Sequence, residues 1–286
     1  MDADDHRHVL LTKLQELLDA GIAEVRYAQP VSPPAGPYQS HAVPRMTVVT
    51  AGRKHIAYND GERSLDEHLP ARTAMFMPPL GWTQPRYDSP REIFGVVFNR
   101  DYTRYLWGHH DGKSLPRAPD AYLHAPITMQ GAAAHLLQAL CVRAKEVRGR
   151  PSSETDRLLF LAMVRIALER LEHAPSERSG RARATWQSLR EYVIEHFHRP
   201  ISRDSTAAAF RLHPNYLSTL FVEQGGESFA HFLIRMRMER AAELLQSGTM
   251  SVAAVGAACG YQDPGYFIKA FRRFHRTTPG RFRRDA

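Results

Sequence analysis

Residues 214–221 read PNYLSTLF and residues 264–271 read PGYFIKAF, so the pattern P-x-Y-[L/F]-x-x-x-F occurs twice at a separation of fifty residues. An alanine pair precedes each copy, Ala207-Ala208 and then Ala257-Ala258. Proline is tolerated in the first turn of a helix, and the apolar positions after it fall on one helical face. Alanines on a preceding short helix allow another helix to cross closely. The pattern therefore predicts two helix-turn-helix units, a motif whose second helix enters the DNA major groove.

The segment between the two copies, SFAHFLIRMRMERAAELLQSG at 228–248, is typical of a single helix. Such a helix would hold two reading helices at a fixed distance, and successive major-groove faces lie about 34 Å apart. One helix-turn-helix unit alone is a weak signal, because many helical hairpins look alike. Two units in register on one connector indicate a DNA-binding region.

The net charge of +8 is concentrated in the last third of the chain. Residues 181–286 contain 16 Lys and Arg against 9 Asp and Glu, so their net charge is 16 − 9 = +7. The remaining 38 − 16 = 22 basic and 30 − 9 = 21 acidic residues leave a net charge of +1 for residues 1–180. This asymmetry indicates either a polyanionic partner for the C-terminal region or a solvated basic face.

Two long stretches of the C-terminal region resemble the AraC/XylS family of transcription regulators. They read YLSTLFVEQGGESFAHFLIRMRMERAAELL and SVAAVGAACGYQDPGYFIKAFRRFHRTTPGRFR, and the resemblance covers about residues 184–284. It implies a DNA-binding domain at 184–286, a linker at 173–183, and an effector-binding and dimerisation domain at 1–172.

Four residues depart from the family's pattern: Thr206, Arg211, Gly256 and Arg276. Thr206 stands where an apolar residue is common, and Gly256 replaces the usual alanine. Arg211 and Arg276 stand where glycine is common, which predicts some backbone strain at both positions.

The same resemblance predicts which side chains read bases. The exposed positions are Asn215, Ser218 and Thr219 on the first reading helix, and Pro264, Gly265 and Lys269 on the second. Asparagine can pair with adenine, and serine or threonine can contact a base edge or a thymine methyl group. Proline and glycine have almost no capacity to read bases, so Lys269 remains as a donor to guanine. We expect the first unit to supply most of the sequence discrimination and the second more of the backbone anchoring.

Further basic residues are expected at the phosphates rather than at the bases. They are Arg211, Arg272, Arg273, Arg276, Arg281, Arg283 and Arg284. The resemblance also implies that Arg237 forms an internal ion pair with Asp263. The aromatic residues of the two units are expected mostly in the core rather than as stacking platforms: Tyr216, Phe221, Tyr266, Phe267 and Phe271.

The N-terminal half has a different texture. Residues 6–21 have the spacing of a helix that ends at Gly21, and short apolar runs with turn signals such as YNDG follow from about residue 45 to 100. Helical patterns return near 128–148 and 153–172. The predicted fold class is α+β in two domains, with a cupin-like β-barrel at 21–125, a helical pair at 126–172, and a C-terminal all-α tandem helix-turn-helix domain.

If the β-rich region is a barrel, its interior can hold a ligand such as a sugar or another small metabolite. Candidate contacts are Arg53, His55, Tyr58 and Trp82, and ordinary core or surface packing is the alternative for each. The second helix of the pair has more apolar surface at 158–171 than one core face needs. We therefore expect a homodimer seam there.

Other chemistry finds little support in the sequence. His41, His55 and His68 are scattered, GHHDG at 108–112 is typical of an exposed loop, and Cys141 and Cys259 are expected as reduced thiols, so we predict no metal and no cofactor. No apolar run is long enough to span a membrane. The prediction is a cytoplasmic regulator whose partners are double-stranded DNA, RNA polymerase and a small-molecule effector. The alternatives are a cupin-type metalloenzyme with an accessory DNA-binding domain and a constitutive regulator without effector.

Overall fold

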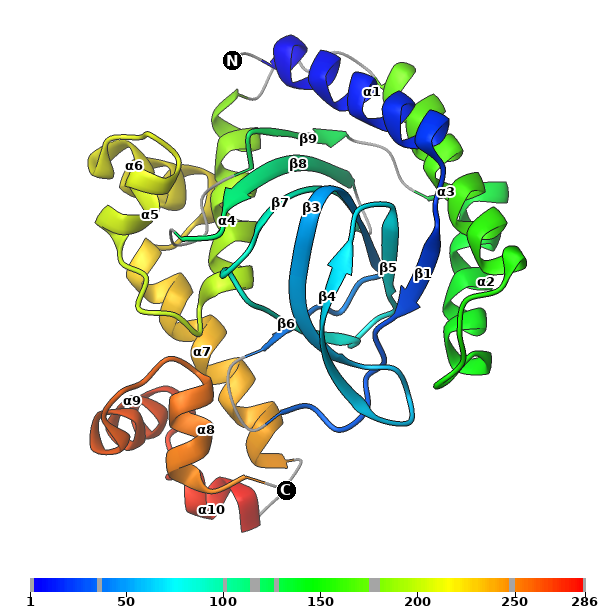
Figure 1. Ribbon diagram of the computed structural model, residues 1–286. Helices are drawn as coiled ribbons and strands as arrows, with labels where there is room; N and C mark the ends of the chain where they lie inside the picture. Colours follow the sequence, from blue (N-terminus) through cyan, green and yellow to red (C-terminus); the bar gives the residue numbers. More distant parts are fainter. Residues whose placement is uncertain are drawn as a thin grey trace. The chain divides into compact units, whose positions relative to one another are not determined.

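The computed structural model describes residues 3–34, 38–99, 102–113, 119–125, 129–174, 181–246 and 250–284 (Figure 1). The chain divides into two compact units. The N-terminal unit comprises Met1–Pro33 and Ser40–Arg181, and the C-terminal unit comprises Pro34–Gln39 and Ala182–Ala286. The first unit contains the strands and three helices, and the second is helical, which confirms the predicted division into a mixed and an all-α region.

The N-terminal unit is built on a mixed β-sheet. Its strands are β1 (Glu24–Tyr27), β2 (Gln39–Ser40), β3 (Arg45–Asn59), β4 (Ser64–Pro70), β5 (Thr73–Met77), β6 (Trp82–Pro85), β7 (Pro90–Phe98), β8 (Thr103–Asp111) and β9 (Ala121–Ala125). The main order is β1-β5-β3-β7-β8-β9, and the β1–β5 pair is parallel. The first half of β3 pairs with β5 and β7, whereas its second half pairs with β4 and β6. One long strand is therefore shared by two layers of the sheet.

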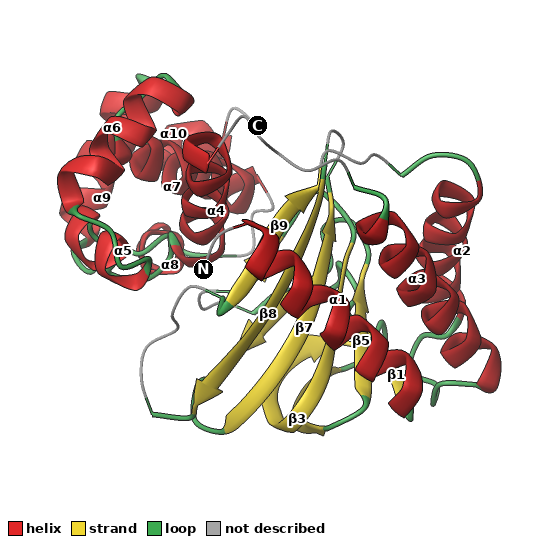
Figure 2. Cartoon of the chain, turned by 90° about the horizontal axis from the view of Figure 1, so that it is seen from above, coloured by secondary structure: helices red, strands yellow, loops and turns green. Residues whose placement is uncertain are grey.

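Three helices cover one face of this sheet: α1 (Ala3–Ala20), α2 (Ala132–Glu146) and α3 (Glu154–Glu172) (Figure 2). Alternation along the strands turns Met46 and Val48 of β3 and Phe94 and Val96 of β7 toward them, and all four are buried. The core on this side also includes Leu10 of α1. We call it the helix-covered face.

The opposite face of the sheet has its own apolar cluster, which includes Val49, Ile56, Leu69, Met75 and Met77. These residues come from β3, β4 and β5. The cluster explains why β5 is buried along its whole length, since it packs on both sides. We call this second side the inner face.

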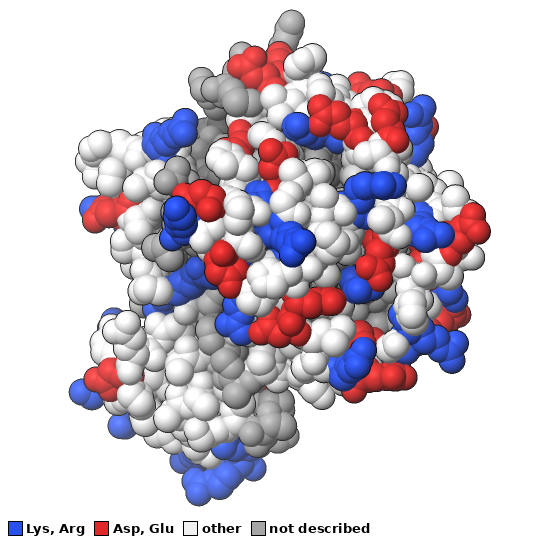
Figure 3. Space-filling model, viewed as in Figure 1, with Lys and Arg blue, Asp and Glu red and all other residues white. Residues whose placement is uncertain are grey.

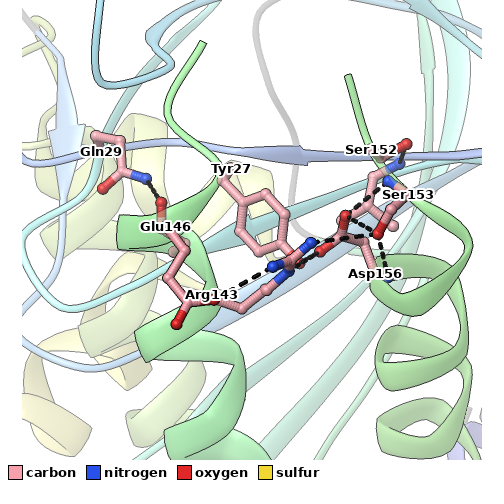
Figure 4. A network of polar contacts seen from close by, with 9 residues as sticks. Tyr27, Gln29, Arg143, Glu146, Ser152, Ser153 and Asp156 are labelled. Carbon is pink, nitrogen blue, oxygen red and sulfur yellow. Dashed lines mark hydrogen bonds and ion pairs between the residues drawn. The ribbon is translucent and has the colours of Figure 1, made fainter. Parts of the chain in front are cut away.

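A buried polar network joins β1, α2 and α3 (Figure 4). Asp156 Oδ1 accepts hydrogen bonds from Tyr27 Oη at 3.0 Å and from Arg143 Nε at 2.8 Å. Ser153 and Asp156 form a capping box that starts α3. Burial alone would raise the pKa of Asp156, but the hydrogen bonds from Arg143, Ser153 and Tyr27 outweigh it and lower that pKa.

The C-terminal unit consists of seven described helices. They are α4 (Arg181–His196), α5 (Arg203–Ala209), α6 (Pro214–Gly225), α7 (Phe229–Gln246), α8 (Val252–Ala258), α9 (Pro264–His275) and α10 (Pro279–Arg284). Leu189, Ala207, Leu217, Phe221 and Phe232 join α4, α5, α6 and α7 in one buried cluster. Figure 1 shows α6 and α9 on the same side of this unit with α7 running between them.

Candidate nucleic-acid interface

The two predicted reading helices begin in the same way. Pro214 and Pro264 are the first residues of α6 and α9, and a side chain just before each caps the helix. The His213 ring accepts from the backbone N–H of Asn215, and Asp263 accepts from the N–H groups of Gly265 and Tyr266. These caps satisfy N–H groups that have no partner within a helix. The doubled pattern at 214–221 and 264–271 therefore marks two helix starts.

The turns before α6 and α9 are similar but differ in length. Each turn passes through a left-handed residue, Arg211 with φ 55° and Gly260 with φ 83°. Two residues separate Arg211 from α6, whereas three separate Gly260 from α9. The structural counterpart of Ala207 is therefore Gly256, because Leu212 N–H and Tyr261 N–H donate to their respective carbonyls at 2.9 and 3.0 Å. The alanine pairs seen fifty residues apart are offset by one residue from true equivalence.

The small residue of each unit faces a different partner on the second helix. A Cβ atom added to Gly256 would lie 3.0 Å from ring carbons of Phe267. In the first unit the corresponding residues are Ala207 and Leu217, and both are fully buried in one cluster. The second unit thus combines the smaller residue, Gly256, with the larger side chain, Phe267. The first unit combines Ala207 with the smaller side chain of Leu217.

The reading helices also end alike and are joined by one helix. Gly226 and Arg276 follow α6 and α9 in the left-handed conformation, with φ of 73° and 58°. The positive φ at Arg211 and Arg276 confirms the strain expected at these two positions. The connector α7 has 18 residues, which corresponds to a length of about 27 Å.

The predicted base-reading residues lie at the surface of the two helices. Asn215, Thr219 and Lys269 are exposed, and Ser218 is half-buried. The hydroxyl groups of Ser218 and Thr219 donate to the carbonyls of Pro214 and Asn215, both at 3.1 Å. Their oxygens can still accept hydrogen bonds. The structure therefore places these side chains in solvent, where a base edge could reach them.

Basic residues are distributed unequally between the two helices. The outward side of α9 has Lys269, Arg272 and Arg273, all exposed, whereas α6 has no basic residue. Arg211, Arg276, Arg281 and Arg284 are exposed as well. Lys and Arg side chains gather over the end of the C-terminal unit that carries α10 (Figure 3). The positive charge of the unit is thus concentrated around its second helix-turn-helix.

Arg283 is placed differently from the other predicted phosphate contacts. Its side chain is half-buried, and Nη2 donates to the carbonyl of Met250 at 2.6 Å. This position braces the segment before α8 and does not favour a contact with DNA.

The predicted ion pair between Arg237 and Asp263 is wrong. Arg237 donates from Nε to the carbonyl of Phe197 at 2.8 Å and from Nη2 to that of Arg199 at 2.9 Å. Asp263 uses its carboxylate on the N-terminus of α9 instead. Arg237 therefore has an internal bracing role, as expected, but it joins α7 to the end of α4.

The prediction that the five aromatic residues lie mostly in the core is confirmed for the three phenylalanines but not for the two tyrosines. Phe221, Phe267 and Phe271 are fully buried, whereas 42% of Tyr216 and 64% of Tyr266 is exposed. Both tyrosines are third residues of their helices, one turn away from the caps. The repeated sequence pattern treats tyrosine as an apolar residue. Because tyrosine has an apolar ring and a polar hydroxyl, it is found both in cores and at surfaces, and the pattern does not distinguish the two.

The four candidate effector contacts do not share one surface. Tyr58 is buried on the inner face and donates to Glu67 Oε1 at 2.7 Å, and Trp82 Nε1 donates to the carbonyl of Val31 at 2.7 Å. His55 and Arg53 alternate to the other side of β3, where Arg53 is exposed. An effector role for any of the four stays a prediction.

His55 contacts two carboxylates, Asp66 at 2.8 Å and Asp88 at 2.6 Å. The part of the chain that the structure describes contains no group of three or more His, Cys, Asp or Glu residues arranged to bind a metal. Within the same residues, no helix has both the length and the apolarity needed to cross a membrane.

Comparison with known proteins places the C-terminal unit among helix-turn-helix domains, since the model of a helix-turn-helix domain family matches residues 206–285. The match begins in α5 and ends just after α10. The match therefore includes both helix-turn-helix units of the C-terminal region, their turns and the connector α7.

Two relatives extend the similarity into the N-terminal unit. An uncharacterized HTH-type transcriptional regulator of Escherichia coli K12, YijO, is 29% identical over 211 residues, which are 74% of this chain and 72% of the relative. A second one from the same organism, YpdC, is 25% identical over 255 residues, covering 89% of this chain and 86% of the relative. Both relatives are named as HTH-type transcriptional regulators.

Among solved structures, the C-terminal domain of AraT, a response regulator from Geobacillus stearothermophilus, is 31% identical. The match covers 37% of this chain and 89% of that one, with a TM-score of 0.36.

Proposed function

We propose, from the premise that the chain belongs to the AraC family of DNA-binding helix-turn-helix transcriptional regulators, that α6 and α9 enter successive major-groove faces of one operator. The observation that carries this proposal is the repeated architecture of the two units: an N1 proline, a side-chain cap, and a left-handed residue at the end. Reading one face of DNA with two helices requires a fixed separation, and a single continuous connector supports that.

The two helix-turn-helix units make different contacts with DNA. Asn215, Ser218 and Thr219 give α6 the groups that discriminate bases, whereas α9 offers Lys269 beside a basic outward side. Arg211, Arg272, Arg273, Arg276, Arg281 and Arg284 contact phosphates and make binding strongly dependent on salt. Tyr216 and Tyr266 join the interface, because a tyrosine hydroxyl can donate to a phosphate oxygen.

The N-terminal unit, a cupin-like β-barrel in this proposal, binds a small-molecule effector and forms a homodimer through α2 and α3. Val142 of α2 and Leu158 of α3 support the dimer, since 48% and 60% of these apolar side chains is exposed. The effector acts only to the extent that it binds one arrangement of units or subunits better than another. The DNA-bound form then contacts RNA polymerase.

Selection of sites from a random duplex library tests the operator proposal. The full chain should enrich a motif with two recognition segments about 10 base pairs apart, and footprinting should protect both on one face of the DNA. A protein that protects a single segment, or that enriches no sequence above non-specific binding, would overturn the proposed two-helix reading.

A further inference from the structure

Ile268 of α9 is an exposed apolar residue at a position that corresponds to a predicted base-reading residue of α6. It is the fifth residue of α9, and 38% of it is exposed. The fifth residue of α6 is Ser218. Both helices begin with a proline and are capped by the residue before it, so equal positions along them have equal directions within their units. Ile268 therefore lies where the first unit presents a side chain that is predicted to read bases.

The neighbours of Ile268 along the helix leave space on one side of it and place positive charge on the other. One turn earlier are Pro264 and Gly265, and neither has a long side chain. One turn later is Arg272, which is exposed. The first residues of a recognition helix are the ones that reach base edges. The short side chains of the first turn therefore let a base pair approach Ile268.

The interior of the unit is formed by other residues of α9. Phe267 and Phe271 are its buried residues, and Ile268 stands at the edge of the face that they form.

The surroundings of Ile268 favour DNA as its partner. An exposed aliphatic residue that binds another protein is expected within a larger apolar patch. Ile268 is instead followed by Lys269 and Arg272, which are exposed and positively charged. Tyr266, a second exposed apolar residue of α9, has its ring 6.0 Å from that of the buried Tyr261. A basic surface attracts the phosphates that flank a base pair.

We propose that Ile268 determines specificity by contacting the C5-methyl group of a thymine in the major groove. The inference rests on the proposed function, because it adds a base contact to the second reading helix. An isoleucine side chain has no hydrogen-bonding group, so it cannot pair with the donors and acceptors of a base edge. Thymine alone among the four bases presents a methyl group there, and apolar side chains recognise it by contact. The second unit then reads an A·T pair through Ile268 as well as a guanine through Lys269.

Replacing thymine by uracil in the operator tests the methyl contact directly. Uracil lacks the C5-methyl group but keeps every hydrogen-bonding group of thymine. Uracil is placed at one thymine at a time, in either strand of the segment where Lys269→Ala changes the base preference. For the full chain, one of these changes should raise the Kd about fourfold, which corresponds to about 0.8 kcal/mol for one buried methyl-sized group. An unchanged Kd at every thymine of the segment would overturn the proposal.

Variants assign the methyl contact to one residue. Ile268→Ser should bind the thymine and uracil operators with equal Kd, whereas Ile268→Val keeps an aliphatic group and should retain a preference for thymine. Ile234→Ser is the matched control, because Ile234 is 40% exposed but lies on the connector α7. It should keep the fourfold difference. An undiminished difference in Ile268→Ser would assign the methyl contact to another residue and contradict the inference.

The reciprocal exchange in the first unit gives a readout that does not depend on the folding of Ile268 variants. Ser218→Ile gives α6 the apolar residue of α9, and it should create a preference for thymine over uracil in the other operator segment. The preference is measured on duplexes that place a thymine at each position of that segment in turn. Equal Kd values for thymine and uracil at every position would show that this helix position does not sense a methyl group.

Footprinting of the unmodified operator keeps the two proposals apart. If the full chain does not protect two segments on one face of the DNA, the proposed two-helix reading fails. If it protects both segments and no loss of a methyl group weakens binding, only the proposed role of Ile268 fails.

Discussion

Asn215 and Lys269 lie on the outward sides of α6 and α9 but offer different chemistry to bases. By position in the helices, Asn215 corresponds to Gly265, and Lys269 to Thr219. The first unit thus has an amide where the second has no side chain, and the second has a cation where the first has a hydroxyl. The two helices share a scaffold and differ at the positions that face outward.

This difference leads to a prediction for two alanine variants. Asn215→Ala should lose about 1–3 kcal/mol of discrimination at one adenine position, and Lys269→Ala should lose a smaller amount of discrimination at one guanine position, because the first unit is expected to supply most of the sequence discrimination. Gel-shift titrations on single-base operator variants at several salt concentrations measure both. Lys113→Ala, which removes an exposed lysine outside the proposed DNA interface and the proposed dimer seam, is the control. Uniform loss across all variants for Asn215→Ala would contradict the assignment.

A second prediction concerns Arg276, which has φ of 58° at the end of α9. A non-glycine residue in this conformation costs about 1–2 kcal/mol, so Arg276→Gly should raise the free energy of unfolding of the C-terminal unit. Loss of the guanidinium should also weaken DNA binding and its salt dependence. Chemical denaturation and gel shifts measure the two effects.

Arg276→Ala is the matched control for this prediction, because it removes the charge but keeps the strained backbone. The alanine variant should lose DNA affinity without gaining stability. If both variants gain the same stability, the strain at Arg276 is not the cause.

At the scale of elements, the helix starts and the helical connector could be predicted from sequence because local rules decide them. Proline at N1 and a polar cap before it act within four residues, and α6 and α9 begin at Pro214 and Pro264 as predicted. The unequal length of the two turns is not predicted in this way, since the one extra residue of the second turn, between Gly260 and Pro264, changes no local pattern. Arg237 was misassigned because its backbone partners, Phe197 and Arg199, are distant in sequence.

The N-terminal sheet shows where sequence reasoning stops. Its β-rich extent was predicted from short apolar runs, but the register that aligns Arg45 with Arg104 and His124 depends on strand pairing across the sheet. Arg53 and His55 are predicted as effector contacts because they are polar residues on an expected strand. Alternation places both on the side of β3 opposite to Lys54, and the burial of Lys54 is not evident from the sequence.

The contact between α8 and α9 leads to a third prediction. Alanine is a better helix former than glycine by about 1 kcal/mol, but crowding a packed core costs about 1–3 kcal/mol. Because the added Cβ of Gly256→Ala would lie 3.0 Å from the Phe267 ring, we expect a net loss of stability. In the Phe267→Leu background, Gly256→Ala should destabilise the unit less or should stabilise it. The resulting Ala–Leu pair is the one that the first unit has at Ala207 and Leu217.

Denaturation of the four proteins of this double-mutant cycle measures the coupling between Gly256 and Phe267. Ala207→Gly with Leu217→Phe provides the reciprocal cycle in the first unit. Additive effects within about 0.5 kcal/mol would mean that the two residues do not compensate each other.

At the scale of the whole molecule, the two units should respond to acid in different pH ranges. In the C-terminal unit, burial and the nearby His196, Arg199 and Arg237 lower the pKa of His198 to about 3. An unfolded histidine has a pKa of about 6.5. Between these values the unfolded chain binds a proton that the folded unit does not, so its stability falls as pH drops below about 6.5, by at most about 1.4 kcal/mol per pH unit.

The N-terminal unit should withstand acid longer. The lowered pKa of Asp156 contributes stability at every pH above the unfolded value of about 3.9, and this contribution is lost only as pH falls further, through the folded pKa. Calorimetry from pH 7.5 to 4 should therefore show one transition moving to lower temperature before the other. A common shift of both transitions would contradict this order.

Variants assign the two transitions. His198→Gln should reduce the pH dependence of the unfolding temperature of the C-terminal unit. Asp156→Asn should lower the free energy of unfolding of the N-terminal unit by about 1–3 kcal/mol at neutral pH, because Arg143 and Tyr27 lose a charged partner.

The Ala–Leu and Gly–Phe pairs also restrict the order in which such a repeat can change over time. Two substitutions separate the pairs, and each order passes through a different intermediate. Gly with Leu leaves a void, whereas Ala with Phe brings a Cβ to 3.0 Å from a ring. A void loses packing contacts, and a Cβ at 3.0 Å requires the ring to shift by a few tenths of an ångström, so each intermediate is packed less well than either pair. The residues at these two positions can therefore change one at a time only at a cost in stability.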